Sequence, residues 1–294
     1  VVKEHVIQLL SLWKKYDISV ILFKGFSLAH FEYQEPSERF HGDVDILISE
    51  DSAIIDRAVG VALALGWRVD DFNHNPKRWT HEVAHLYSPD GLVRIDAHRF
   101  VISLSTGLSL EKARILTHTV WKNAKDRTLV SKNWQIQTLI PAPYDALIIC
   151  QALNRCYGGA SGGFKAADYF DSSVLIKRYQ ISQEEALAYA NSLRAGSTWK
   201  AFQTCINPWD KRVHLNPQWT AQIVENKLKQ EGLSSKKGLA FHRIKRFFEL
   251  IPLLPSVIPD LFAAWKAYQS SGDPRQNLEL WQSQHQKPVQ TRLG

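Results

Sequence analysis

The stretch of sequence at residues 40–48 reads FHGDVDILI. Its apolar residues predict a β-strand over residues 43–49, on which Asp43 and Asp45 point to the same side, ~6.6 Å apart along the strand. No Lys or Arg follows within this run, so the two carboxylates repel each other unless a cation lies between them. Hard divalent ions such as Mg²⁺ favour such oxygen ligands together with substrate phosphates. The stretch therefore indicates a metal site, the alternative being the solvated face of an edge strand.

A third aspartate, Asp96, follows on a predicted hairpin. Residues 88–91 read SPDG, a turn signal between two alternating segments at residues 82–87 and 92–100. Asp96 lies on the second arm, and a third carboxylate from a neighbouring strand would complete a two-metal phosphoryl-transfer site. His98 shares the face of Asp96, where it either contacts substrate, supports a carboxylate or is a structural histidine.

A glycine follows a β-branched apolar run upstream of the two aspartates. Residues 18–23 read ISVILF and predict a strand, Lys24 and Gly25 follow, and residues 26–33 predict a helix. A glycine at a strand-to-helix junction lets backbone N–H groups approach a phosphate, although a tight turn alone would also require it. Lys24 and Arg39 are then either triphosphate ligands or ordinary surface charges.

These motifs resemble the nucleotidyltransferases of the DNA polymerase β-like superfamily. More narrowly, LFKG at residues 22–25, RFHGDVDIL at 39–47 and IDAH at 95–98 resemble an uncharacterised bacterial nucleotidyltransferase group, and the likeness covers roughly residues 1–100. The chain departs from the superfamily pattern at Phe26, where a small residue is usual, and Ser27 is expected to supply the hydroxyl.

The resemblance implies a Mg²⁺- or Mn²⁺-dependent transfer of a nucleoside monophosphate from an NTP, with release of pyrophosphate. Asp43 and Asp45 would hold the metal, and Asp96 would complete the second metal site or deprotonate the acceptor. The expected nucleotide-binding residues are Lys24, Gly25, Ser27, Arg39, Gly42 and Lys165.

The second half of the chain is predicted to be helical. Helices are expected at residues 143–154, 164–178, 182–193, 219–230, 239–250 and 261–268. The motif FKAADYFD at 164–171 resembles a Lys-x-x-Asp helix of related transferases. One face of this helix carries Lys165, Asp168 and Asp171. These side chains either form an intrahelical ion pair or belong to a lid that contacts the nucleotide. The fold class is therefore α+β: a mixed sheet with flanking helices (1–125), a helical substrate- and nucleotide-binding domain (126–270) and a loosely ordered tail (271–294).

The segment HEVAH at residues 81–85 has the literal pattern of zinc proteases. That pattern requires a helix, where residues four apart lie within ~6 Å of each other. On a strand the two histidines would be ~13 Å apart, too far for one ion. The segment leads directly into the SPDG turn and has strand-type residues, so a strand is predicted and a metalloprotease is the least favoured function.

Composition indicates a soluble, cytoplasmic protein. No apolar run reaches the ~18–20 residues that span a bilayer, and three cysteines without metal-ligand spacing indicate reduced thiols. Lys and Arg exceed Asp and Glu over the whole chain by 7. The basic excess lies after residue 115, which suits a polyanionic partner such as an NTP or RNA; solvated basic helix faces are the alternative.

The sequence leaves the acceptor open. A small-molecule hydroxyl, a protein side chain and a tRNA end all fit the same metal chemistry, because a fold does not choose the acceptor. The basic second half favours RNA. The alternative function is a catalytically silent member of the fold that binds nucleotide or RNA.

Overall fold

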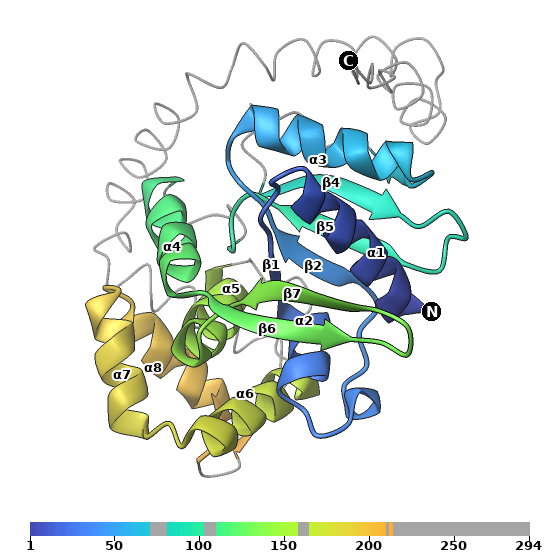
Figure 1. Cartoon of the computed structure of the whole chain (residues 1–294). Coiled ribbons are helices and arrows are strands. Elements are labelled where there is room, and N and C mark those ends of the chain that lie inside the picture. Colours follow the sequence, from blue (N-terminus) through green and yellow to red (C-terminus); the bar gives the residue numbers. More distant parts are fainter. Residues whose placement is uncertain (71–80, 103–109, 158–164, 210–211, 214–294) are drawn as a thin grey trace, which may run out of the picture.

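A seven-stranded mixed sheet with helices on both faces forms the centre of the protein (Figure 1). The computed structural model describes residues 1–70, 81–102, 110–157, 165–209 and 212–213. The strand order is β3-β4-β5-β2-β1-β7-β6. The mixed sheet and the helices after it confirm the predicted α+β class.

Three central strands position the aspartates. β1 (Ile21–Phe23) pairs antiparallel with β2 (Val44–Leu47), and β2 pairs parallel with β5 (Arg94–His98). In the β2–β5 register Asp45 lies directly opposite Asp96. Paired residues on neighbouring strands project to the same face of a sheet, so the two carboxylates emerge side by side.

The predicted hairpin is present at one side of the sheet. β4 (Glu82–Tyr87) pairs antiparallel with β5, and β3 (Arg68–Asp70) pairs antiparallel with β4 at the edge. The HEVAH segment is therefore a strand from Glu82 onward, as predicted. The β4–β5 register shifts between Glu82 and Ala84, which is a β-bulge.

Two strands extend the sheet beyond residue 125. β6 (Lys125–Val130) and β7 (Gln135–Ile140) form an antiparallel pair, and β7 runs parallel to β1, with Leu139 opposite Ile21. Neither strand was among the elements predicted from the sequence, and the exposed, charged residues of β6 carry a weak strand signal. The division at residue 125 stays a prediction, but the sheet itself continues to Ile140.

Alternation along the strands gives each face of the sheet its own core. On one face Leu22, Ile46 and Ile95 pack with α1 (Val2–Lys15) and α3 (Ser52–Ala64). On the other face Ile21, Phe23 and Leu47 pack with α4 (Leu110–Asn123) and the helices after the sheet. The side chains of this second face alternate in register with Asp45, Asp96 and His98. These three residues therefore also face the helical half of the protein.

α2 (Lys24–Phe31) leaves β1 directly and contributes to both cores, and a short 3₁₀ helix (Pro36–Glu38) leads from it toward β2.

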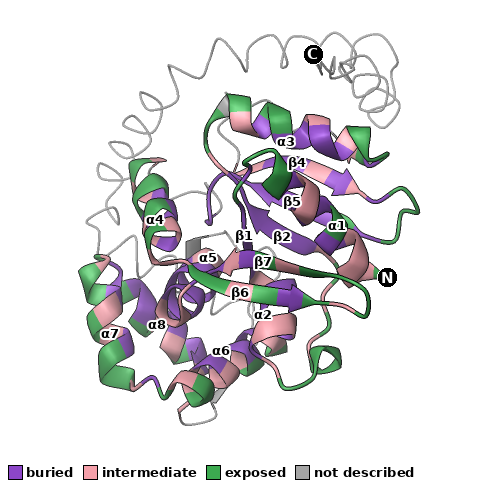
Figure 2. Cartoon of the chain, viewed as in Figure 1, coloured by how far each residue is buried: buried purple, intermediate pink, exposed green. Residues whose placement is uncertain are grey.

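The helical half begins with a π-helix, Asp145–Leu153, that is buried throughout and continues into α5 (Asn154–Tyr157). α6 (Ala166–Tyr179), α7 (Gln183–Ser192) and α8 (Gly196–Cys205) follow, and the short strands β8 (Ile206–Asn207) and β9 (Arg212–Val213) pair with each other. Their inward sides are buried and their outward sides exposed (Figure 2). The first three predicted helices are present and α8 was not predicted. The other three and the tail lie outside the described residues.

Within the described part of the chain, none of the helices has the length and apolar character needed to cross a membrane.

Candidate active site

A cleft of about 1120 Å³ lies between the sheet and the helical half. Its sheet side carries most of the residues predicted from the sequence, and its helical side carries a set of charged residues. The sheet side comprises Lys24, Gly25, Arg39, Gly42, Asp43, Asp45, His81, Glu82 and Asp96, and the helical side includes Arg155, Lys165, Asp168, Phe170 and Asp171. The fold thus brings together residues more than 120 positions apart in the sequence.

Asp45 is buried at the floor of the cleft and accepts two hydrogen bonds. Lys24 Nζ donates to its Oδ1 over 2.7 Å, and His98 Nε2 lies 2.9 Å from the same oxygen. Burial alone raises the pKa of this carboxyl, but the Lys24 charge and the His98 contact lower it to about 2. The sequence showed no cation within the run that contains Asp45, and its two partners come from other segments of the chain, the start of α2 and β5.

His98 is fully buried beside Phe23, whose ring lies 5.1 Å away between centroids. Burial and the nearby Lys24 charge lower the pKa of His98 to about 4, outweighing the opposite effect of Asp45. A charged imidazole at His98 would lower the pKa of Asp45 the most. The low pKa of His98, however, keeps its ring neutral at pH 7. We therefore attribute the charge of Asp45 chiefly to Lys24, with His98 as a neutral donor.

Asp96 lies beside Asp45 and is held by a different cation. Arg94 donates Nε and Nη2 to its two oxygens over 2.7 and 3.0 Å, and His85 Nε2 lies 3.9 Å from Oδ1. Burial raises the pKa of the Asp96 carboxyl, and His85 and Arg94 offset this only in part. This carboxyl is the more readily protonated of the buried pair.

Asp43 lies just before β2, which begins one residue later than the strand predicted from residue 43. Its side chain is half-buried and lines the cleft, so three carboxylates reach this cavity from adjoining segments.

The junction between β1 and α2 has an unusual backbone. Lys24 has a φ of 57°, in the left-handed region, which costs a residue with a Cβ roughly 1–3 kcal/mol. At Gly25 an added Cβ would come within 3.2 Å of the His41 Cβ and 3.6 Å of the Arg39 guanidinium. An added side chain at Gly25 would therefore force its neighbours to shift slightly, whereas a Cβ at Gly42 would meet nothing within 4 Å.

Ion pairs on the helical side connect the two halves of the protein. Arg39 donates Nε and Nη2 to the carboxylate of Asp171 over 2.7 and 3.0 Å, and the Tyr33 hydroxyl donates to the same carboxylate over 2.7 Å. Arg155 Nη2 donates to Asp168 over 2.8 Å. Arg39 and Asp171 thus join α6 to the segment before β2, which is a role that the sequence did not predict for either residue.

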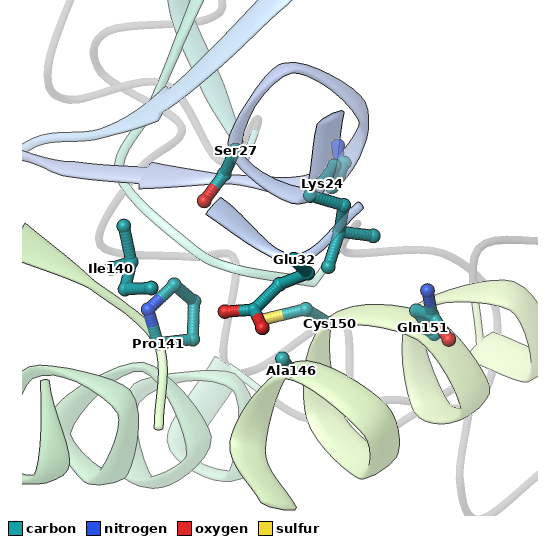
Figure 3. Close-up of a pocket in the computed structure, with 9 residues that line it drawn as sticks. Lys24, Ser27, Glu32, Ile140, Pro141, Ala146, Cys150 and Gln151 are labelled. Carbon is teal, nitrogen blue, oxygen red and sulfur yellow. The ribbon is translucent and has the colours of Figure 1, made fainter. Parts of the chain in front are cut away.

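Ser27 does not line the cleft. It is 3% exposed and lies at a much smaller pocket with Glu32, Cys150 and Gln151 (Figure 3). Burial raises the pKa of the Glu32 carboxyl there, although Tyr179 and Arg178 oppose the effect. Lys24 contributes to the walls of both cavities.

Sequence reasoning missed three groups of the cleft. Arg155 has no motif around it, and its contact with Asp168 on α6 cannot be read from the local sequence. His81 and Glu82 were considered only as parts of a protease motif. The exposed rings of Phe40 and Phe170, on opposite sides of the cleft, carry no sequence signal that separates them from core aromatics.

His30 and His41 lie close together near Gly25, and the low pKa of His30 predicts that the stability of the protein depends on pH. Burial, followed by the Lys3 and His41 charges, lowers the pKa of His30 from 6.5 to about 4. The unfolded chain therefore binds more protons between these values, so stability is complete at neutral pH and falls as the pH drops toward 4. Allowing for the partial exposure of His30, we expect a loss of about 1 kcal/mol between pH 7.5 and pH 5.

Urea denaturation of the wild type and of His30→Gln across this range measures the effect. The variant is expected to show a flatter pH dependence, and His118→Gln, at an exposed site on α4, is expected to keep the wild-type slope. Equal slopes in the wild type and in His30→Gln would contradict the assignment.

Comparisons with known proteins show what this chain is similar to. A family model described as "Uncharacterised nucleotidyltransferase" matches residues 2–202, which include the whole sheet and reach α8. A solved structure described as an antigenic nucleotidyltransferase-like protein from Paracoccidioides brasiliensis is similar over 72% of this chain and 94% of its own, with 16% sequence identity and a TM-score of 0.40. No curated protein matches the chain.

Proposed function

We propose a function from the premise that this chain belongs to the family of uncharacterised nucleotidyltransferases. The proposed reaction moves a nucleoside monophosphate from an NTP to an acceptor hydroxyl. A bond forms between the acceptor oxygen and the α-phosphorus, the bond from that phosphorus to the β-phosphate bridging oxygen breaks, and pyrophosphate and the hydroxyl proton leave.

The observation that carries this proposal is the pairing of Asp45 with Asp96 across parallel strands at the floor of the cleft. With Asp43 just before the start of β2, these residues offer an all-oxygen donor set, which is the set that Mg²⁺ and Mn²⁺ prefer. The Lys24 ammonium and the Arg94 guanidinium, each 2.7 Å from one carboxylate, show that the site favours positive charge. The residues therefore fit a divalent cation.

We assign the metal to Asp43, Asp45 and Asp96. When bound, Mg²⁺ or Mn²⁺ supplies positive charge that neutralises the triphosphate and polarises the phosphoryl group under attack. Lys24 supplies a further positive charge beside Asp45, and His98 orients that carboxylate through its hydrogen bond.

The remaining roles follow from the two sides of the cleft. Asp96, the carboxyl with the raised pKa, takes the proton of the acceptor hydroxyl. Gly25, at the start of α2, and Gly42 line the same side of the cleft, where their backbone is proposed to meet the phosphates. Arg39 and Lys165 contribute positive charge at the boundary between the sheet and α6.

The proposed setting of the reaction is the cytoplasm, where thiols stay reduced. The three cysteines, Cys150, Cys156 and Cys205, are buried, and none of them is in a disulfide bond. The proposed acceptor is a small molecule, a protein side chain or a tRNA, and the basic second half of the sequence favours RNA.

A second candidate function is nucleotide or RNA binding without catalysis. The observation in its favour is that Lys24 and Arg94 already neutralise the two buried carboxylates. Nucleotide binding that is independent of divalent metal, measured by calorimetry with each of the four NTPs, would support this alternative.

Incubation with α-labelled NTPs and Mg²⁺ tests the proposed transfer. Total tRNA, whole-cell protein and a small-molecule extract are offered separately as acceptors, and the fraction that takes up label identifies the acceptor class. Label is expected in one fraction, with release of pyrophosphate that EDTA abolishes. Absence of label and of pyrophosphate from every NTP and every fraction would contradict the transferase function.

A further inference from the structure

At the start of β4, His81 and Glu82 line the wall of the cleft. Alternation along a regular strand would place Glu82 and His85 on opposite faces. The bulge between Glu82 and Ala84 adds one residue to β4 and restores their common face, with Glu82 opposite His98 and His85 opposite Asp96 in the register. The irregular strand thus gathers on one face side chains that the sequence pattern would separate.

His81, Glu82 and His98 form a compact set of metal-ligating groups. Their ligand atoms all lie within 4.8 Å of one another, and His81 Nε2 is 3.2 Å from Glu82 Oε1. The His81 and His98 ring centroids are 5.3 Å apart. In a tetrahedral zinc site with bonds of ~2.0–2.1 Å, neighbouring ligand atoms lie about 3.3–3.4 Å apart. The observed separations, 3.2 Å in one pair and at most 4.8 Å in the others, therefore need shifts of no more than about 1.5 Å to surround one ion.

The surroundings of His98 provide a second, independent observation. This side chain is 1% exposed, its Nε2 bonds Asp45 over 2.9 Å, and its Nδ1 is buried with no hydrogen-bond partner in the described part of the chain. Histidines that bind a metal through one nitrogen commonly donate the other N–H to a carboxylate. Asp45 and His98 already have this relationship, so Nδ1 is the nitrogen left with an available lone pair.

We propose that His81, Glu82 and His98 bind one transition-metal ion of the Zn²⁺ class, in addition to any hard cation on the three aspartates. Two imidazoles and one carboxylate favour Zn²⁺ over Mg²⁺, and three protein ligands leave an open position toward the cleft. Through His98, the ion orients and polarises the hydrogen bond to Asp45. The HEVAH segment thus contributes its first two residues to a metal site without the helix that a zinc protease requires.

A second group of metal-ligating residues, Glu82, His85 and Asp96, shares the same glutamate. It offers only one imidazole, and Asp96 is already assigned to the proposed hard cation. His85 Nε2 lies 3.2 Å from Glu82 Oε2, so in the proposed site His85 orients the glutamate from outside the ligand set. The two groups differ in which histidine binds the ion: loss of His81 removes a ligand from the first group only, and loss of His85 removes a ligand from the second group only.

Zinc titration of the metal-stripped full chain tests the site, read by calorimetry and by elemental analysis after gel filtration. The wild type is expected to bind one Zn²⁺ in the presence of excess Mg²⁺, and Co²⁺ is expected to give the visible absorption of a low-coordinate site. His81→Ala is expected to lose this ion. His85→Ala is expected to keep it, with affinity lowered by no more than about 100-fold.

The matched control is His41→Ala, which removes a histidine from the same cleft but from neither group. It is expected to bind zinc as the wild type does, and circular dichroism checks that every variant is folded. No stoichiometric zinc in the folded wild type, or zinc that His81→Ala retains, would overturn the proposal. Because binding is the readout, the result is independent of whether the chain transfers nucleotides.

Discussion

Replacing Asp45 by asparagine is expected to lower the rate of nucleoside monophosphate transfer by on the order of 10³-fold or more. The substitution removes the buried charge that the proposed metal requires. Metal ions stabilise transferring phosphoryl groups by several kcal/mol, and a 10³-fold loss of rate corresponds to about 4 kcal/mol. Asparagine keeps the size of the side chain and one acceptor oxygen for Lys24 or His98. Initial rates of pyrophosphate release with saturating NTP and Mg²⁺ measure the loss.

The control for this experiment is Asp56→Asn, at an exposed position on α3 and on the opposite face of the sheet from Asp45. It changes the same chemical group and is expected to leave the rate unchanged. Thermal melts show whether Asp45→Asn is still folded at the assay temperature. A folded Asp45→Asn protein with wild-type transfer activity would refute the assignment of the site.

The largest expected effect on stability comes from Asp171→Ala. Asp171 is almost fully buried, and its loss leaves Arg39 and the Tyr33 hydroxyl without their shared acceptor. Removing one partner of a buried ion pair costs ~3–5 kcal/mol, and the partial exposure of Arg39 favours the lower end. We expect the free energy of unfolding to fall by about 3 kcal/mol, measured by urea denaturation.

Asp126→Ala is the matched control, because Asp126 is exposed on β6. Its expected change is within about 0.5 kcal/mol. Tyr33→Phe removes only the hydroxyl bond to Asp171 and is expected to cost about 1–2 kcal/mol. An Asp171→Ala protein as stable as the Asp126→Ala protein would show that the pair does not connect the two halves energetically.

Local patterns predicted the elements that carry the aspartates. The alternating segments on either side of the SPDG turn became β4 and β5, and the apolar residues after Asp43 became β2. Strand alternation also assigned Asp96 and His98 correctly to one face. These features depend on residues close together in the chain, so a pattern within a dozen residues contains the necessary information.

Contacts between distant segments could not be predicted in this way. Lys24 pairs with Asp45 because β1 and β2 lie side by side in a particular register, and no local pattern specifies that register. The bulge in β4 changes the face of Glu82 without a glycine or proline to mark it. Arg39 was predicted as a phosphate ligand from its position, whereas its partner Asp171 comes from a helix far along the chain.

The position of β1 in the sheet has a consequence for how the chain folds. β1 is fully buried, yet one of its two neighbours, β7, is synthesised only after most of the other strands. Until β7 arrives, a nascent chain presents the unpaired backbone of an apolar strand, which is a template for wrong pairing and aggregation. A fragment ending at residue 125 would keep this edge open permanently. Recombinant fragments should therefore extend at least through Ile140.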